Sequence, residues 1–395
     1  MKYSKHNNYT KVTRSKFLFL VYYCLFFISL FVVNVNIDPI IAASIAKIFK
    51  IIVMLALLIH SLFFSWKKSL IYRLIICILI GLLFLITSGD FYWVLVLLMG
   101  VVASKIEENY IFKLSFILIS ILTILTFFFY CIGFLPDNLT SRTDFSDTVR
   151  HSFGFLYSNV LPNCIFYILI FYLTLKKNKA KFSFVLGCTL LSIFVYNFCE
   201  SRNALVGVVL LVISFYICKS NIINLNKGRI LRVGAKWSFF VCCFASIIPS
   251  YLRSLSIGLP IWYKLDRIVT NRTLIGSTAI EAYGIHFFNR MTSEEYTSRS
   301  IMVDSYKWNG VILDSGYLYI LIRYGICALL FFALIYYSIL KAYKMDYFMC
   351  SLLILLSIIN MIDNNFLSYG FLPFVLIGIR NLWIQRGKRK LIIKI

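Results

Sequence analysis

The feature that most constrains this chain is a series of long apolar runs. A helix needs roughly 17–25 mostly apolar residues to cross the hydrocarbon core of a bilayer. Runs near this length occur about twelve times. The expected spans are 17–36, 45–65, 69–87, 90–104, 112–135, 155–175, 182–199, 203–218, 237–252, 317–339, 346–362 and 365–383. Because lipid cannot satisfy open backbone groups, these runs predict an all-α, polytopic membrane helical bundle.

Composition excludes a soluble fold. Hydrophobic residues make up 61% of the chain and charged residues only 14%, so a water-soluble protein could not hide this apolar surface. The formal net charge of +24 is explained by basic connections that fix membrane topology, and we expect no nucleic-acid partner. The 11 cysteines lie in or at the ends of apolar runs, and no Cys/His cluster has metal-ligand spacing. We therefore expect no metal and no cofactor.

Lys and Arg are distributed over most connections as the positive-inside rule requires. Lys47 and Lys50, at the outer end of the second expected span, are exceptions: either they reach to the interface or the boundary of this span lies elsewhere. The N-terminal segment, the connections 176–181 and 219–236, and the tail after the last span are basic. The connections 88–90 and 363–364 carry no Lys or Arg. This pattern predicts cytoplasmic N- and C-termini, and the shortness of the 363–364 connection predicts a very tight turn there.

Three regions follow from this topology. Residues 1–252 hold the first nine spans with an outside loop near 136–154, residues 253–316 form a large extracytoplasmic loop, and residues 317–395 hold the last three spans and a basic cytoplasmic tail. A loop of roughly sixty residues is far longer than ordinary connections and is usually functional. Its mixture of arginines and aromatic rings suits sugar and phosphate ligands.

Polar residues at the outer ends of the spans are candidates for chemistry. Arg150 can hold a phosphate through two parallel hydrogen bonds, or it can lie at the interface beside aromatic side chains without binding anything. Arg202 belongs to a charged junction between two apolar runs, where ionisable residues tend to face cavities and to be paired. The alternative is that Glu200 and Arg202 pair locally and only cap a helical hairpin.

Further candidates lie in the large loop and where the chain re-enters the membrane. Arg272 is either an anion clamp or part of a solvated loop face. Asp314 is either a general base or the N-cap of the next helix. Arg323 would cost at least about 2.5–3.5 kcal/mol inside a span unless it meets water or a partner, so we expect it to face inward. His151 and His286 are either proton acceptors near neutral pH or ordinary polar surface residues.

Three short patterns carry a resemblance to a known family. They are RHSFGF at 150–155 followed by Asn159, ESRNAL at 200–205, and DSGYL at 314–318 followed by RYG at 323–325. Together with the number of spans, the cytoplasmic ends and the large late loop, they resemble the Wzy-type polymerases of bacterial O-antigens and capsular polysaccharides. The related O-antigen ligases usually have a histidine where Asp314 stands, and this difference favours a polymerase.

The resemblance implies a metal-independent glycosyltransferase in the bacterial cytoplasmic membrane. It would transfer the growing chain from undecaprenyl diphosphate to the next lipid-linked repeat unit at the outer face. The implied partners are the lipid-linked oligosaccharide, the lipid bilayer and a chain-length regulator. The implied substrate- and diphosphate-binding residues are Arg150, Arg202, Arg272, Arg323, Asn159 and Tyr317, and the implied catalytic residues are Asp314, His286 and His151. A lipid-linked-oligosaccharide flippase or other transporter, and an O-antigen ligase, are the alternatives.

Overall fold

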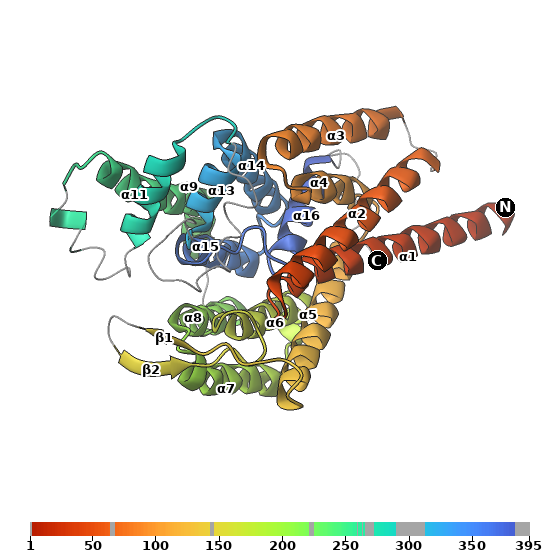
Figure 1. Cartoon of the computed structure of the whole chain (residues 1–395). Coiled ribbons are helices and arrows are strands. Elements are labelled where there is room, and N and C mark those ends of the chain that lie inside the picture. The colour runs from red at the N-terminus through yellow and green to blue at the C-terminus, as the bar shows by residue number, and fades with distance from the viewer. Residues whose placement is uncertain are drawn as a thin grey trace. The chain divides into compact units, whose positions relative to one another are not determined.

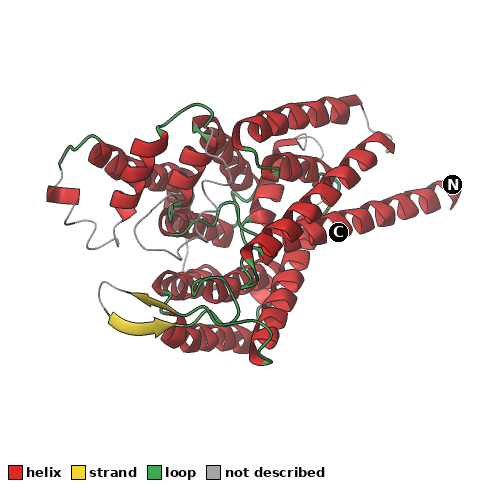
Figure 2. Ribbon diagram, viewed as in Figure 1, coloured by secondary structure: helices red, strands yellow, loops and turns green. Residues whose placement is uncertain are grey.

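The computed structural model describes residues 2–63, 68–142, 146–220, 225–258, 260–262, 264, 272–289 and 313–383. Within this part of the chain, helices form nearly all of the regular structure (Figure 2), so the all-α prediction is confirmed. The chain divides into two compact units. Unit 1 comprises Met1–Ile78, Val94–Val212 and Ser368–Ile395, and unit 2 comprises Leu79–Trp93 and Ile213–Leu367.

Unit 1 contains most of the N-terminal half of the chain and the last helix (Figure 1). Its elements are α1 (Lys2–Val32), α2 (Pro39–Phe63), α5 (Glu108–Cys131), β1 (Thr140–Arg142), β2 (Ser146–Arg150), α6 (Val160–Lys176), the 3-10 turn η1 (Lys177–Lys179), α7 (Phe182–Cys199) and α16 (Leu372–Trp383). Three more helices run from one unit into the other: α3 (Lys68–Ser88), α4 (Tyr92–Ala103) and α8 (Arg202–Lys219).

The core of unit 1 is built on two helices that are buried on nearly every side. The part of α4 in this unit is buried throughout, and so is nearly all of α16. A helix that is hydrophobic all round must be enclosed by protein or lipid. Gly100 of α4 lies so close to Ile379 of α16 that an added Cβ would collide with that side chain. Close approach of these two helices therefore depends on the absence of a side chain at position 100.

The one sheet among the described residues is small and lies in the predicted outside loop near 136–154. Strands β1 and β2 pair antiparallel, with Thr140 opposite Arg150 and Ser141 opposite Val149. The register shifts between Ser141 and Arg142. In Figure 1 this hairpin lies beside α7, and the two elements are in contact.

Unit 2 consists of α9 (Leu225–Ser254), α11 (Arg272–Tyr283), α13 (Gly316–Tyr324), α14 (Ile326–Ala342) and α15 (Tyr347–Ile362), with the end of α3, the start of α4 and the end of α8. Helices α11 and α15 both pack on α9. Its core is aromatic: the rings of Phe239, Tyr317 and Phe366 are in mutual contact, with centroids 4.9–6.0 Å apart. Phe332 completes this cluster at 5.0 Å from Phe366.

Two details of the predicted spans were wrong. The run 317–339 is not one helix, because Gly325 has φ +89° and separates α13 from α14. The turn near Asp363 is not tight, because α15 ends at Ile362 and α16 begins only at Leu372. The chain between them turns the ring of Phe366 into the aromatic core of unit 2, where it is 2% exposed.

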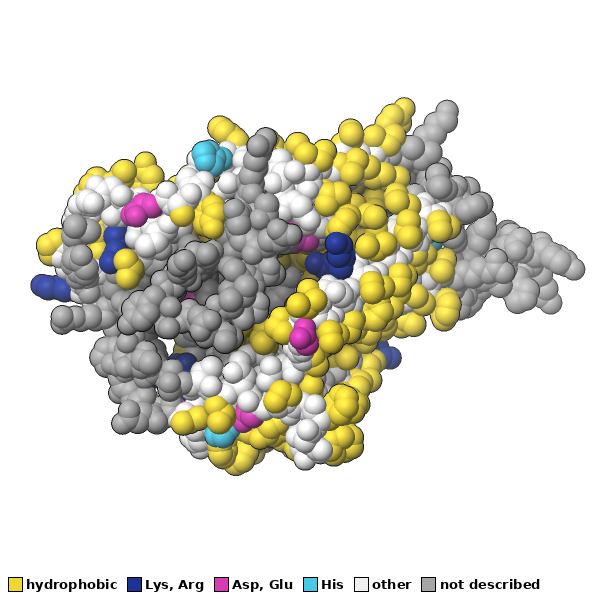
Figure 3. Space-filling view, viewed as in Figure 1, with side chains coloured by type: hydrophobic (Ala, Val, Ile, Leu, Met, Phe, Trp, Pro, Cys, Tyr) yellow, Lys and Arg dark blue, Asp and Glu magenta, His cyan; other side chains and the backbone are white. Residues whose placement is uncertain are grey.

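The outward surfaces of the helices are apolar. Five helices are long and apolar enough to cross a membrane: Pro39–His60, Glu108–Cys131, Phe182–Cys199, Arg202–Lys219 and Gly228–Ser254. Only 22–28% of each apolar window is buried inside the protein, and the space-filling view shows hydrophobic side chains spread widely over the visible surface (Figure 3). Exposed apolar surface of this extent requires lipid. The chain is therefore a multi-pass membrane protein; the number of twelve spans stays a prediction.

Candidate functional site

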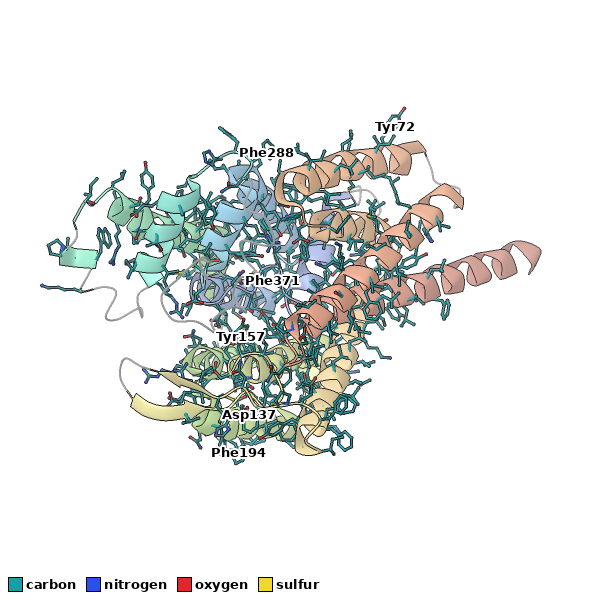
Figure 4. The ribbon with its side chains drawn as sticks, in the orientation of Figure 1. Tyr72, Asp137, Tyr157, Phe194, Phe288 and Phe371 are labelled. Atoms are coloured by element: carbon teal, nitrogen blue, oxygen red, sulfur yellow. The ribbon has the colours of Figure 1, made fainter. Side chains whose placement is uncertain are left out.

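In unit 1 a polar cluster is organised around Asp137, in the segment between α5 and β1 (Figure 4). Its Oδ1 accepts hydrogen bonds from the backbone N–H groups of Ser152 and Phe153, at 2.7 and 3.0 Å, and from the hydroxyl of Ser152 at 3.0 Å. Its Oδ2 lies 2.7 Å from Nδ1 of His151. Both oxygens of one carboxylate therefore hold the chain around residue 152.

The backbone around this cluster is bent in a way that only a few residues allow. Phe153 and Gly154 both have positive φ, 52° and 80°, and an added Cβ on Gly154 would press on Tyr130 and Leu135. Glycine adopts this conformation without steric cost. The bend carries the chain back to the connection between α1 and α2, where Asn36 donates its backbone N–H to the carbonyl of Gly154 at 2.9 Å.

Burial by itself raises the pKa of the Asp137 carboxyl. The hydrogen bonds from His151, Ser152 and Phe153 outweigh burial and lower the pKa below its usual value of 3.8. Asp137 is thus ionised at neutral pH, and an ionised carboxylate can only accept hydrogen bonds. Nδ1 of His151 must then carry the shared proton, which leaves Nε2 of a neutral His151 as a proton acceptor.

Arg150 and Glu200 form the second part of this cluster. Nε of Arg150 lies 3.3 Å from Oε2 of Glu200, and both side chains are about a quarter exposed. Glu200 ends α7 in a left-handed conformation with φ 49°. The backbone N–H of His151 also donates to the carbonyl of Phe198 at 3.0 Å. The end of α7 is thereby tied to the strand that carries Arg150.

Arg202 is the candidate arginine that takes no part in the ion pairs described for this cluster. It begins α8 and is exposed, and its guanidinium has no side-chain partner among the described residues. The partner that Glu200 has in the structure is Arg150, so the local Glu200–Arg202 cap expected as the alternative is replaced by a long-range pair. Asn159 is also exposed, and its side chain makes no capping bond at the start of α6.

In unit 2 the candidates Arg272 and Asp314 come together. Arg272 begins α11, Asp314 precedes α13, and Nε of Arg272 lies 3.8 Å from Oδ2 of Asp314. The N-cap residue of α13 is Ser315. Asp314 therefore does not occupy the N-cap position that was its alternative role.

A second arginine lies at the same helix ends. Arg253, in the last turn of α9, donates from Nη1 to the hydroxyl of Thr273 at 3.3 Å, and both residues are buried. An added Cβ on Gly276 of α11 would collide with Ser250 of α9 and Leu318 of α13. The three helices therefore meet closely where Arg253, Arg272 and Asp314 lie.

Two buried donors in this region of unit 2 lack an acceptor. Nε of Arg272 and the hydroxyl of Ser315 are fully covered, and neither has a hydrogen-bond partner among the described residues. Ser315 is 6% exposed. Buried polar groups are normally satisfied, so an anion with several acceptor oxygens is the kind of ligand that this arrangement of donors fits.

Arg323 is buried, and its charge is already paired. Nη2 of Arg323 lies 3.1 Å from Oδ2 of Asp90, and Nη1 donates to the hydroxyl of Tyr319. The hydroxyl of Tyr324 donates to the same oxygen of Asp90 at 2.8 Å. The guanidinium carbon also stands 5.4–5.5 Å from the ring centroids of Tyr319 and Tyr324. This guanidinium holds α13 to the start of α4.

Tyr317 and His286 occupy contrasting positions. Tyr317 is fully buried in the aromatic core, and its hydroxyl donates to the carbonyl of Ser357 at 3.2 Å. The side chain of His286 is exposed, and its carbonyl accepts from the N–H of Ile326 at 3.0 Å. Its imidazole has no hydrogen-bond partner among the described residues. A binding role for Tyr317 and a catalytic role for His286 stay predictions.

For two ion pairs the sequence indicated only one member: His151 without Asp137, and Arg323 without Asp90. Asp137, Asp90 and Arg253 were not candidates, although each contacts or adjoins one. The available signal was an acid at the edge of an apolar run, as at Asp90, together with an arginine inside another run. No group of three or more His, Cys, Asp or Glu side chains in the described part of the chain is arranged to hold a metal ion.

The fold and its polar clusters define the class of this protein: an α-helical, multi-pass membrane protein with arginine-containing clusters at helix ends. In comparisons with known proteins, the chain matches no family model, no curated protein and no solved structure.

Proposed function

We propose that this protein polymerises lipid-linked oligosaccharide repeat units of an O-antigen or capsule at the outer face of the bacterial cytoplasmic membrane. The observation that carries the proposal is the group formed by Arg253, Arg272, Asp314 and Ser315 in unit 2. It combines two guanidinium groups with the hydroxyl of Ser315. This hydroxyl and Nε of Arg272 are buried without a hydrogen-bond acceptor among the described residues. A diphosphate has the charge and the acceptor oxygens that such a group requires.

The proposed reaction is a glycosyl transfer with a diphosphate leaving group. A hydroxyl of the acceptor sugar attacks the anomeric carbon of the growing chain, and the bond from that carbon to the diphosphate oxygen breaks. Negative charge develops on undecaprenyl diphosphate as it leaves. Fixed cations at that oxygen lower the barrier, and removing one such group typically costs about 10²–10³ in rate. Two arginines are candidates for this cation, each argued from its own unit: Arg272 in unit 2 and Arg202 in unit 1.

The attacking hydroxyl must lose its proton. Among the predicted bases, His151 has the better-prepared environment, because Asp137 fixes its tautomer and leaves Nε2 as an acceptor. The Asp314 carboxylate lies 3.8 Å from Nε of Arg272, so it is engaged with that guanidinium. We assign His151 the role of base and Asp314 the role of holding Arg272.

The test is a gel of surface polysaccharide from cells that lack this protein. A single repeat unit in place of the ladder is expected, since units would still cross the membrane and be attached. Loss of all repeat units would instead identify a flippase, and loss of the attached polysaccharide with lipid-linked polymer still present would identify a ligase. An unchanged ladder would refute all three activities.

A further inference from the structure

Helix α9 carries an exposed stripe of apolar side chains that no described element covers. Ile230, Val233, Trp237, Val241 and Phe244 are 51–73% exposed. Their spacing of three, four and seven residues places them along one face of the helix. The residues that bind α9 to the rest of unit 2, such as Ala235, Phe239 and Cys242, are buried. The stripe is therefore the lipid-facing side of α9.

At the N-terminal end of this stripe, one arginine lies beside an apolar groove. Arg229, Ile230, Val233 and Gly234 line an open groove of about 410 Å³. Gly234 contributes no side chain to it, and an added Cβ there would touch Ile354 at 3.4 Å. Arg229 is exposed, and no ion-pair partner for it lies among the described residues.

A second cation lies on the same face. Lys236 is seven residues, or about two turns, after Arg229, and its Nζ stands 5.5 Å from the ring centroid of Trp237. Both Lys236 and Trp237 are exposed. By contrast, Arg232 is turned toward the protein, where Nε donates to the carbonyl of Gly228 at 3.1 Å and Nη1 to Sδ of Met345 at 3.8 Å. The two outward cations thus remain available to a ligand.

The sequence of α9 puts this groove at the level of lipid headgroups. The helix is charged up to Lys236 and uncharged from Trp237 to Leu252. Tryptophan is enriched where the hydrocarbon core meets the headgroups, and lysine side chains reach toward the water there. The groove lies on the headgroup side of Trp237, and the apolar stripe continues from it into the hydrocarbon region.

We propose that this face of α9 binds an anionic phospholipid, with its phosphate between Arg229 and Lys236 and an acyl chain along Val233, Trp237 and Val241. A groove with cations at one end and an apolar track at the other matches the charge and the polarity of such a lipid. A second copy of this chain fits less well. A two-fold interface formed by the stripe would bring identical cations opposite each other.

The experiment uses the full-length protein in vesicles in which brominated lipid quenches nearby tryptophan. Emission from Trp237 is obtained as the difference between the wild type and a Trp237→Phe variant. We compare brominated phosphatidylglycerol with brominated phosphatidylcholine at equal mole fraction. Because each cation near the surface favours anionic lipid about fivefold, phosphatidylglycerol is expected to be enriched near Trp237 by about fivefold or more.

A double variant and a matched control separate specific binding from general attraction. Arg229→Gln with Lys236→Gln should bring the quenching ratio of the two lipids to about one. Lys341→Gln with Lys344→Gln removes the same charge from exposed lysines at and after the end of α14 and should leave the ratio unchanged. Equal quenching in the wild type, or a ratio that survives the first double variant, would overturn the proposal. Disulfide-linked dimers from Val233→Cys, with no quenching of Trp237 by either lipid, would establish a second copy as the occupant.

Discussion

Arg323 and Arg202 stand at opposite extremes of what an arginine can do in this protein. Arg323 is buried in unit 2, with Asp90 as its counter-ion and two tyrosine rings around it. Arg202 is exposed at the start of α8 in unit 1. Both lie in or beside apolar runs, and for both the resemblance to polysaccharide polymerases implies binding of a diphosphate.

The difference lies in what already neutralises each charge. A buried arginine has lost its bound water, and its charge is stable there only because a partner takes the place of that water. Such an arginine cannot leave its partner for a ligand without a large cost, so its burial indicates a structural role. An exposed arginine without a partner retains its whole charge for a ligand. Depth in the membrane alone is therefore a poor indicator of function.

The largest effect is expected from Arg323→Met. It leaves the Asp90 carboxylate buried without its counter-ion, and removing one member of a buried pair typically costs about 3–5 kcal/mol. The yield of folded protein in detergent should fall sharply. The double variant Arg323→Met with Asp90→Asn should recover most of it, because asparagine can still accept the hydrogen bond from the N–H of Tyr92. A stable, monodisperse single variant that has lost activity would make Arg323 a functional residue.

Arg202→Ala should have the opposite profile. Its guanidinium has no side-chain partner in the part of the chain that the structure describes, so thermal stability should be unchanged. Polymer formation should fall about 10²–10³-fold. The polysaccharide ladder and the amount of membrane protein are measured on the same cells. Lys219→Ala, at the other exposed end of α8, is the control and should retain the ladder. Full-length polymer from Arg202→Ala would remove this residue from the site.

Arg272→Ala tests the corresponding arginine of unit 2, which is intermediate between the two extremes. It has one loose ion pair, with Asp314 at 3.8 Å, and a side chain that is 24% exposed. We expect a loss of polymer of about 10²-fold and a loss of stability below about 1 kcal/mol. Arg272→Lys should recover only part of the activity, because lysine cannot form parallel hydrogen bonds to a phosphate. A ladder identical to that of the wild type in both variants would contradict the assignment.

Asp137→Asn tests whether the cluster of unit 1 positions a base. Asparagine can still accept from the N–H groups of Ser152 and Phe153, but its amide favours the other tautomer of His151. Activity should fall at least about tenfold at the pH optimum, with a cost of about 1 kcal/mol in stability. Glu281→Gln, at an exposed acid of α11, serves as the control. A variant with wild-type activity would show that Asp137 only shapes the loop.

The smallest effect is the pH dependence of the same loop. The pKa of Asp137 is lowered on folding, so its contribution to stability is present above about pH 4 and is lost as the pH falls through the folded pKa. Cleavage by pepsin between residues 132 and 159 should therefore increase in the wild type as the pH falls through the lowered pKa of Asp137. In Asp137→Asn the cleavage should depend less on pH. Identical profiles would mean that this carboxylate does not hold the loop.

Much of the secondary structure could be predicted because an apolar run in lipid has few alternatives to a helix. The break at Gly325 was missed, since Tyr324 and Ile326 continue the apolar pattern on both sides. In the structure, an added Cβ on Gly325 would collide with the carbonyl of Phe287, and the N–H of Cys327 donates to that carbonyl at 3.2 Å. The reason for the break lies in a segment almost forty positions earlier, which no local pattern reveals.

The candidate site, like the secondary structure, could be predicted only in part. Arg272 and Asp314 were both predicted, and the structure brings them together. The carboxylate that holds Arg323 was missed, because Asp90 and Arg323 are 233 positions apart in the chain. Asp137, only 14 positions before His151, was missed as well. The local sequence shows which residues are charged and where they lie relative to an apolar run. Which charges form pairs depends on which helix ends meet in the folded protein.

The sequence alone determined that this chain lies in a membrane as helices, because 61% hydrophobic residues leave no other way to remove apolar surface from water. It also determined which arginines and acids lie at helix ends. Only the tertiary structure decided which of these charges are already neutralised. Arg323 and Arg150 each meet a carboxylate from a distant segment, while Arg202 meets none among the described residues. The energy of a charge depends on its neighbours in space, and those neighbours are set by the packing of helices.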